Sequence, residues 1–152
     1  MREPNVSKVL RFMLYVIFVF GVAVMATLPF MIDKYGALLY DAYFYERGYR
    51  TFILTFLMIL GVFGIWIVGE LIGIMHTVRV DPFIKKNVSA LRRIGILAVC
   101  VATLFAVKCV LFVTFLTVVC VFLFIICGML AFTLCSLFKQ AVAFKEENDL
   151  TI

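Results

Sequence analysis

The feature that most constrains this chain is an apolar stretch over residues 94–138, whose only charged residue is Lys108. A bilayer core is about 30 Å thick and needs roughly 20 helical residues to cross it. A single helix over this stretch would be about 67 Å long, so the stretch must fold back as two spans. A soluble domain is about half apolar and a quarter charged. This chain is 66% hydrophobic and 15% charged, so lipid must cover part of its surface.

Charge and length place the spans. Lys108 must reach water, which puts the reversal near residues 108–114 and predicts spans at 94–108 and 114–138. Two earlier apolar stretches, 12–32 and 51–75, complete the set, and a Tyr-rich connection over 33–50 separates them. The first stretch is longer than the 7–15 apolar residues typical of a signal peptide, so we expect it to be retained. The predicted fold is an all-α membrane protein, a four-transmembrane-helix bundle forming one membrane domain over residues 1–152.

The polar segment between the second and third spans predicts a short cytoplasmic amphipathic helix before span three. Asp81 is a good N-cap and Pro82 suits the first helical position. Apolar Phe83, Val88 and their neighbours share one face, and basic residues occupy most of the other. Such a helix is expected to lie at the membrane surface, either as an anchor on anionic lipid or as a docking site for a cytoplasmic partner.

The basic residues predict the orientation of the chain. Ten of the 14 Lys and Arg residues lie at the amino end, in the middle segment or in the tail at 139–152. Basic residues collect on the cytoplasmic side, so both termini are expected there. The net charge of +5 is explained in the same way, and no direct binding of nucleic acid is expected.

Glu70 is the only acidic residue well inside a span, and such a residue is a functional candidate by default. Lys108 is the second candidate of the intramembrane site, although their depths differ by about 16 Å, so direct pairing is not expected. One interpretation pairs Glu70 with Arg11, His76 or Arg92 near the inner interface. The alternative is a proton or cation site in a small transporter, channel or bacteriocin-immunity-type protein.

Gly69 and Gly73 form a GxxxG pair, which lets helices approach closely in lipid. The contact is predicted either inside the bundle or in a homo-oligomer. The five cysteines lie in apolar stretches without metal-ligand spacing, which favours packing roles. The sequence contains no motif for a catalytic triad, phosphate loop or zinc site, so we predict a non-enzymatic protein without a cofactor.

Two segments resemble those of the YoaS-like bacterial membrane proteins, a family of unknown function numbered 2975. The shared positions form a Pro-Phe…Asn-Val…Leu-Arg-Arg-Ile-Gly segment and an acidic end: Pro82, Phe83, Asn87, Val88, Leu91–Gly95 and Glu146–Ile152. Lys108 and the Cys-rich fourth span depart from the family pattern. The resemblance implies four spans, a bacterial plasma membrane location and no assigned reaction. It also implies a link with a small helix-turn-helix transcriptional regulator as cytoplasmic partner.

These observations predict an interaction surface on the cytoplasmic side of the membrane. Its acidic tail residues are expected to pair in cis with basic residues of the middle segment. The candidate residues are Asp81, Pro82, Phe83, Asn87, Arg92, Arg93, Glu146, Glu147, Asp149 and Ile152.

Overall fold

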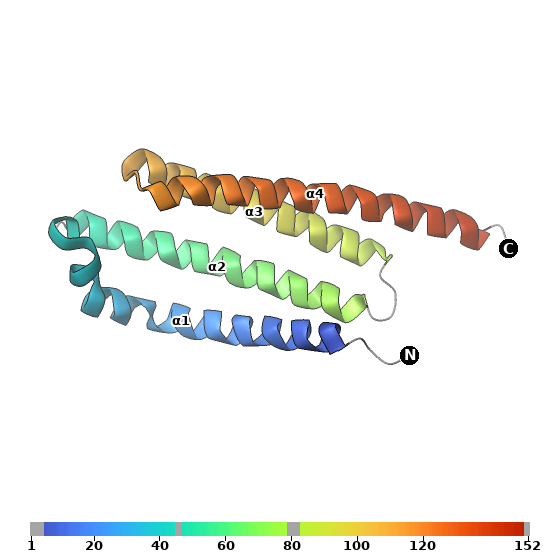
Figure 1. The fold of residues 1–152 in the computed structure, drawn as a ribbon, viewed down its shortest axis with the longest axis horizontal. Coiled ribbons are helices and arrows are strands. Elements are labelled where there is room, and N and C mark those ends of the chain that lie inside the picture. Colours follow the sequence, from blue (N-terminus) through green and yellow to red (C-terminus); the bar gives the residue numbers. More distant parts are fainter. Residues whose placement is uncertain (1–4, 45–46, 79–82, 151–152) are drawn as a thin grey trace.

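The computed structural model describes residues 5–44, 47–78 and 83–150. These residues form four helices and no strand: α1 (Asn5–Phe44), α2 (Arg47–Thr77), α3 (Lys85–Leu111) and α4 (Phe115–Leu150). The helices alternate in direction, as Figure 1 shows. The start of α1, the end of α2, the start of α3 and the end of α4 therefore lie together. We call this the terminal end of the bundle, and the opposite end the turn end.

Each helix contains a segment long and apolar enough to cross a membrane. These segments are Ser7–Ile32, Gly48–Thr77, Lys85–Leu111 and Phe115–Asn148. Lipid offers no hydrogen-bond partners to the backbone, so a spanning chain is helical or a closed barrel. The prediction of an all-α membrane protein with four spans is confirmed, and the chain is a multi-pass membrane protein.

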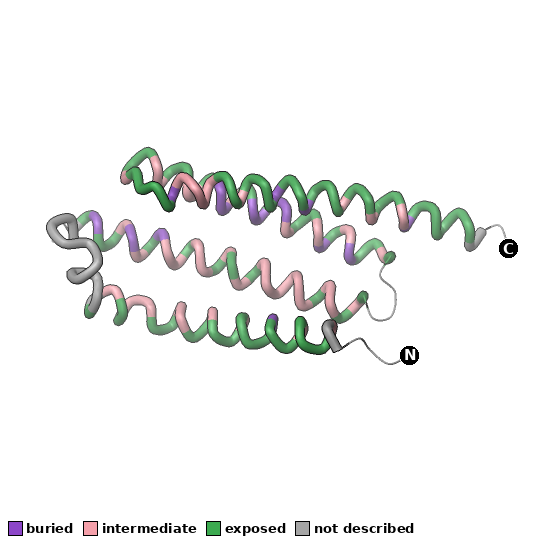
Figure 2. Tube along the Cα trace, in the orientation of Figure 1, coloured by how far each residue is buried: buried purple, intermediate pink, exposed green. Residues whose placement is uncertain are grey.

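The described helices pack in chain order: α1 against α2, α2 against α3, and α3 most extensively against α4. Buried positions gather on α3, where small residues let the neighbouring helices approach (Figure 2). Examples are Ala90, Ala98 and Ala102, each at most 5% exposed. By contrast, an open apolar cavity of about 360 Å³ lies between α1 and α2. The hairpin α3–α4 is thus the best-packed part of the fold.

The reversal between α3 and α4 falls at residues 112–114, inside the predicted range of 108–114. Phe112 caps α3 in an extended conformation (φ −142°), and its N–H donates to the Lys108 carbonyl at 2.8 Å. The Thr114 carbonyl then accepts hydrogen bonds from the N–H groups of Thr117 and Val118. Any residue adopts the conformation of Phe112, which explains why no glycine marks it.

The start of α3 differs from the predicted one. Ile84 is the N-cap, in an extended conformation without a side-chain hydrogen bond, and the helix begins at Lys85. The prediction that Pro82 opens this helix was therefore wrong, and Asp81 and Pro82 lie outside the described residues. The expected amphipathic segment is helical and forms the first turns of α3 itself. Nothing between Lys85 and Ile94 interrupts a helix, so the segment continues directly into span three.

Two helices are much longer than a bilayer requires. The 40 residues of α1 measure about 60 Å and the 36 of α4 about 54 Å, against roughly 30 Å of hydrocarbon. Part of the Tyr-rich connection belongs to α1, which reaches Phe44. Most of the tail belongs to α4, which extends past the other helices at the terminal end (Figure 1).

Candidate functional site

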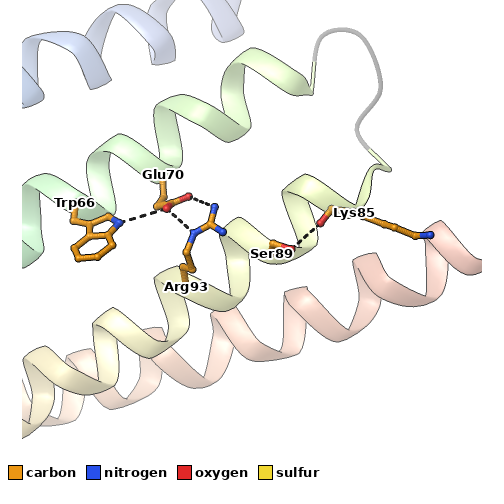
Figure 3. Close-up of polar contacts among 5 residues, drawn as sticks. All are labelled: Trp66, Glu70, Lys85, Ser89 and Arg93. Atoms are coloured by element: carbon orange, nitrogen blue, oxygen red, sulfur yellow. Dashed lines mark hydrogen bonds and ion pairs between the residues drawn. The ribbon is translucent and has the colours of Figure 1, made fainter.

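The charged pair Glu70–Arg93 joins α2 to α3 inside the apolar segments. Arg93 Nε lies 2.6 Å from Glu70 Oε1, and Arg93 Nη2 lies 2.8 Å from Oε2. Trp66 Nε1 donates to Oε1 at 3.4 Å from one turn earlier on α2. Figure 3 shows the carboxylate between the two donors. This is the bidentate geometry that makes an Arg–carboxylate pair strong.

The position of the pair explains its chemistry. Glu70 lies seven residues before the end of α2 at Thr77, about 10 Å along the axis. Arg93 lies eight residues after the start of α3, about 12 Å in. Charges at this depth are costly unless they are paired, and here each charge neutralises the other. The prediction that Glu70 meets Arg11, His76 or Arg92 was wrong in the identity of the partner, although an ion pair was correctly expected.

A second polar contact lies nearer the terminal end, in the contact between α2 and α3, which we call the α2–α3 seam. The Thr77 hydroxyl donates to Asn87 Oδ1, and Asn87 is 1% exposed. A buried amide needs such a partner. The structure therefore places Asn87 inside the helix contact instead of on the predicted interaction surface.

Lys108 lies at the turn end, about 22 Å along α3 from Arg93. Its Nζ donates to Thr117 Oγ1 at 3.2 Å and lies 5.6 Å from the centre of the Phe56 ring. Thr117 is 2% exposed. Lys108, which is half-exposed, therefore contacts α2 and α4, where an aromatic face and a hydroxyl stabilise its ammonium group. As expected, Glu70 and Lys108 do not share a site.

Phe56 belongs to a cluster of aromatic rings that joins three helices. They pair as Tyr49–Phe112, Phe52–Phe56, Phe52–Phe112, Phe56–Phe105 and Phe105–Phe124, with ring centres 4.7–6.2 Å apart. The α2–α3 seam is therefore polar at the terminal end and aromatic at the turn end.

The terminal end carries a helical surface that we call the terminal platform: residues 85–93 of α3 and 139–150 of α4. Lys85 Nζ and Glu146 Oε1 lie 2.8 Å apart, which confirms for this pair the predicted contact between tail and middle segment. Val142, 6% exposed, packs between the two helices. The rings of Phe83 and Phe138 add a contact at 5.7 Å. The extension of α4 is thus held against α3.

The other predicted surface residues are placed as follows. Phe83, Arg92 and Glu147 are exposed, whereas Arg93 is engaged by Glu70. Ile152 and the side chain of Asp149 lie outside the described residues, like Asp81 and Pro82.

Sequence reasoning missed Trp66 and Thr77 as polar partners. The spacing of Trp66 and Glu70, four residues apart, places them on one helix face and was a usable signal.

Neither the cysteines nor the glycine pair builds a site here. In the described part of the chain, His, Cys, Asp and Glu nowhere gather in a group of three that could hold a metal ion. The Cys135 thiol donates to the Val88 carbonyl at 3.4 Å, a packing contact between α4 and α3. Gly69 and Gly73 have open space beside them, so their GxxxG pair makes no close contact inside the described fold.

Comparison with known proteins identifies the family. Residues 10–152 match a family described as protein of unknown function (DUF2975). The match covers nearly the whole chain, so this chain belongs to that family, as the resemblance indicated. The curated proteins and the solved structures give no match.

Proposed function

We propose that this DUF2975 protein is a non-enzymatic subunit of the bacterial plasma membrane that docks a cytoplasmic protein on its terminal platform. Both termini are then cytoplasmic, a placement that rests on the distribution of basic residues. The proposed partner is a small helix-turn-helix regulator, the class of protein that the family resemblance implied. Docking would hold such a regulator at the membrane and away from DNA.

The extension of α4 is the observation that carries this proposal. Residues 139–150 continue the helix by about 18 Å beyond the apolar stretch. Phe144 lies about 9 Å beyond that stretch and its side chain is 68% exposed. Buried aromatic residues are common anchors of protein interfaces, and an exposed one on a braced helix suits this role.

Charge complementarity supports the choice of partner. Glu146 and Glu147 lie two and three residues after Phe144, beyond Lys145, and are exposed. A DNA-binding regulator carries a basic surface for phosphate contacts, which would fit an acidic helix end. An acidic helix end that occupies this surface would compete with DNA.

Docking is tested with a photo-crosslinking residue at position 144 in cells that also produce a candidate helix-turn-helix regulator. A crosslink to the regulator is expected at 144 and not at Phe122, which is similarly exposed but lies within the apolar stretch of α4.

Phe144→Ala is expected to weaken binding of the purified regulator about thirtyfold, as loss of an interface anchor of about 2 kcal/mol does. Phe122→Ala should change it less than about twofold. Unchanged binding by Phe144→Ala and by a chain lacking residues 146–152 would refute the proposal.

Orientation is tested separately by labelling cysteines in intact cells. In a background without the five native cysteines, Lys34→Cys should react with an impermeant maleimide because it lies at the turn end. Phe144→Cys should react only after the membrane is permeabilised. The opposite pattern would place the platform outside the cytoplasm and exclude a cytoplasmic partner.

The alternative, a small transporter, channel or immunity-type protein using Glu70, receives less support from the geometry. Both carboxylate oxygens of Glu70 accept hydrogen bonds from Arg93. An ion or proton would have to compete with that pair for the same oxygens.

A further inference from the structure

A groove runs between the first turns of α3 and the extension of α4, with a volume of about 350 Å³. Its polar lining consists of Lys85, Ser89, Lys139 and Glu146. Val88, Val142 and Ala143 provide its apolar floor. Positive charge and apolar surface thus meet in one concave site within the terminal platform, and Phe144 does not line it.

The charge of this groove is not neutralised within the described chain. Glu146 is paired with Lys85 at 2.8 Å, and Figure 3 shows Lys85 extending from α3 toward α4. Lys139 has no ion pair among the described residues. The groove therefore offers one uncompensated ammonium group beside its apolar floor, which favours an anionic ligand with an apolar part.

The depth of the groove indicates the source of that ligand. Lys139 is the first charged residue after the apolar stretch of α4, and on α3 the apolar stretch begins just after Arg93. Lys139 shares the groove with Val88 of α3, so both lie where hydrocarbon gives way to headgroups. A lysine at this level attracts anionic lipid.

We infer that this groove binds an anionic phospholipid, with its phosphate at Lys139 and the upper part of its acyl chains over the apolar floor. A free phosphate ion would leave the floor uncovered, and a soluble peptide would have to enter the headgroup layer. The site does not rest on the docking function, because a lipid fits the groove whichever protein contacts Phe144.

The test titrates the purified full-length protein in detergent with phosphatidylglycerol or phosphatidylcholine and follows bound lipid by native mass spectrometry. Phosphatidylglycerol is expected to bind about fivefold more tightly, since one basic residue near the surface contributes roughly that factor. Lys139→Gln should remove this preference. Lys86→Gln is the matched control. Lys86 is exposed on α3 next to Lys85 but does not line the groove, so the preference for phosphatidylglycerol should persist.

A second variant tests the floor without changing charge. Ala143→Phe should fill the groove and weaken phosphatidylglycerol binding about as much as Lys139→Gln, with helix content checked by circular dichroism. Equal effects of Lys86→Gln and Lys139→Gln, equal binding of the two lipids, or displacement of the lipid by inorganic phosphate would overturn the inference. Crosslinking of a partner at position 144 reports on docking alone, so the two proposals can fail independently.

Discussion

Glu70→Gln is expected to lower the free energy of unfolding by about 2 kcal/mol, because it leaves Arg93 charged and unpaired in an apolar segment. We expect a smaller loss of stability than the 3–5 kcal/mol typical of a fully buried pair. The Arg93 side chain is 46% exposed and can turn toward the membrane–water interface. Glutamine keeps the size of the side chain and an acceptor for Trp66, so the variant isolates the charge. Reversible unfolding in mixed micelles measures the change.

A double-mutant cycle separates the pair from its surroundings. Arg93→Gln should cost about as much as Glu70→Gln, and the double variant should cost less than the sum, because neither charge is then left alone. Arg92→Gln is the control, since Arg92 is exposed one residue away and should change stability by less than about 0.5 kcal/mol. Additive losses, or an equal loss in the control, would contradict the proposed structural role of the pair.

The same variants distinguish this role from the transport alternative. A structural pair predicts that Glu70→Gln and Arg93→Gln act alike on stability and leave ion flux in proteoliposomes unaffected. A transport site predicts that Glu70→Gln alone changes the flux while insertion stays normal. Flux that depends on Glu70 at unchanged stability would favour the alternative.

The number of spans and the reversal after Lys108 followed from physical limits that the sequence carries directly. An apolar stretch twice as long as a bilayer is thick must turn, and its single charge marks where. Neither argument depends on which helix faces which.

The partner of Glu70 could not be predicted because it depends on the rotation of α3. Adjacent residues of a helix point about 100° apart, so Arg92 and Arg93 face different neighbours. The rotation is set by packing of α3 between α2 and α4, where small residues meet the flanking helices. Sequence periodicity shows which face is apolar but not which helix covers it.

Asn87 was misjudged because composition was taken as a guide to exposure. An asparagine beside two lysines suggests a surface, yet the Thr77 hydroxyl satisfies its amide and permits burial. The tail after Phe138 is rich in Ala, Lys, Gln and Glu, which are strong helix formers, and α4 continues through it to Leu150.

Gly128→Leu is expected to cost about 2 kcal/mol, because it overpacks a close contact between α4 and α3. A Cβ at Gly128 would lie 3.1 Å from Val99 Cγ2 and 3.4 Å from the backbone oxygen of Gly95. A Cβ at Gly95 would lie 2.9 Å from the Phe132 ring. The leucine must therefore push α4 away from α3. Unfolding in mixed micelles measures the loss, and the Gly128→Ala variant should show a smaller one.

Gly69→Leu with Gly73→Leu is the matched control, since nothing lies within 4 Å of a Cβ at either position. This double variant should unfold within about 0.5 kcal/mol of the unchanged protein when both are monomeric. Because this GxxxG pair is open, it is also where a second copy of the chain would approach most closely. A homo-oligomer built on it should dissociate in the double variant and persist in Gly128→Leu, as measured by light scattering in detergent. Loss of monomer stability in the double variant would show that Gly69 and Gly73 pack inside the bundle, contrary to the structure. An oligomer that survives both leucines would exclude this face as its interface.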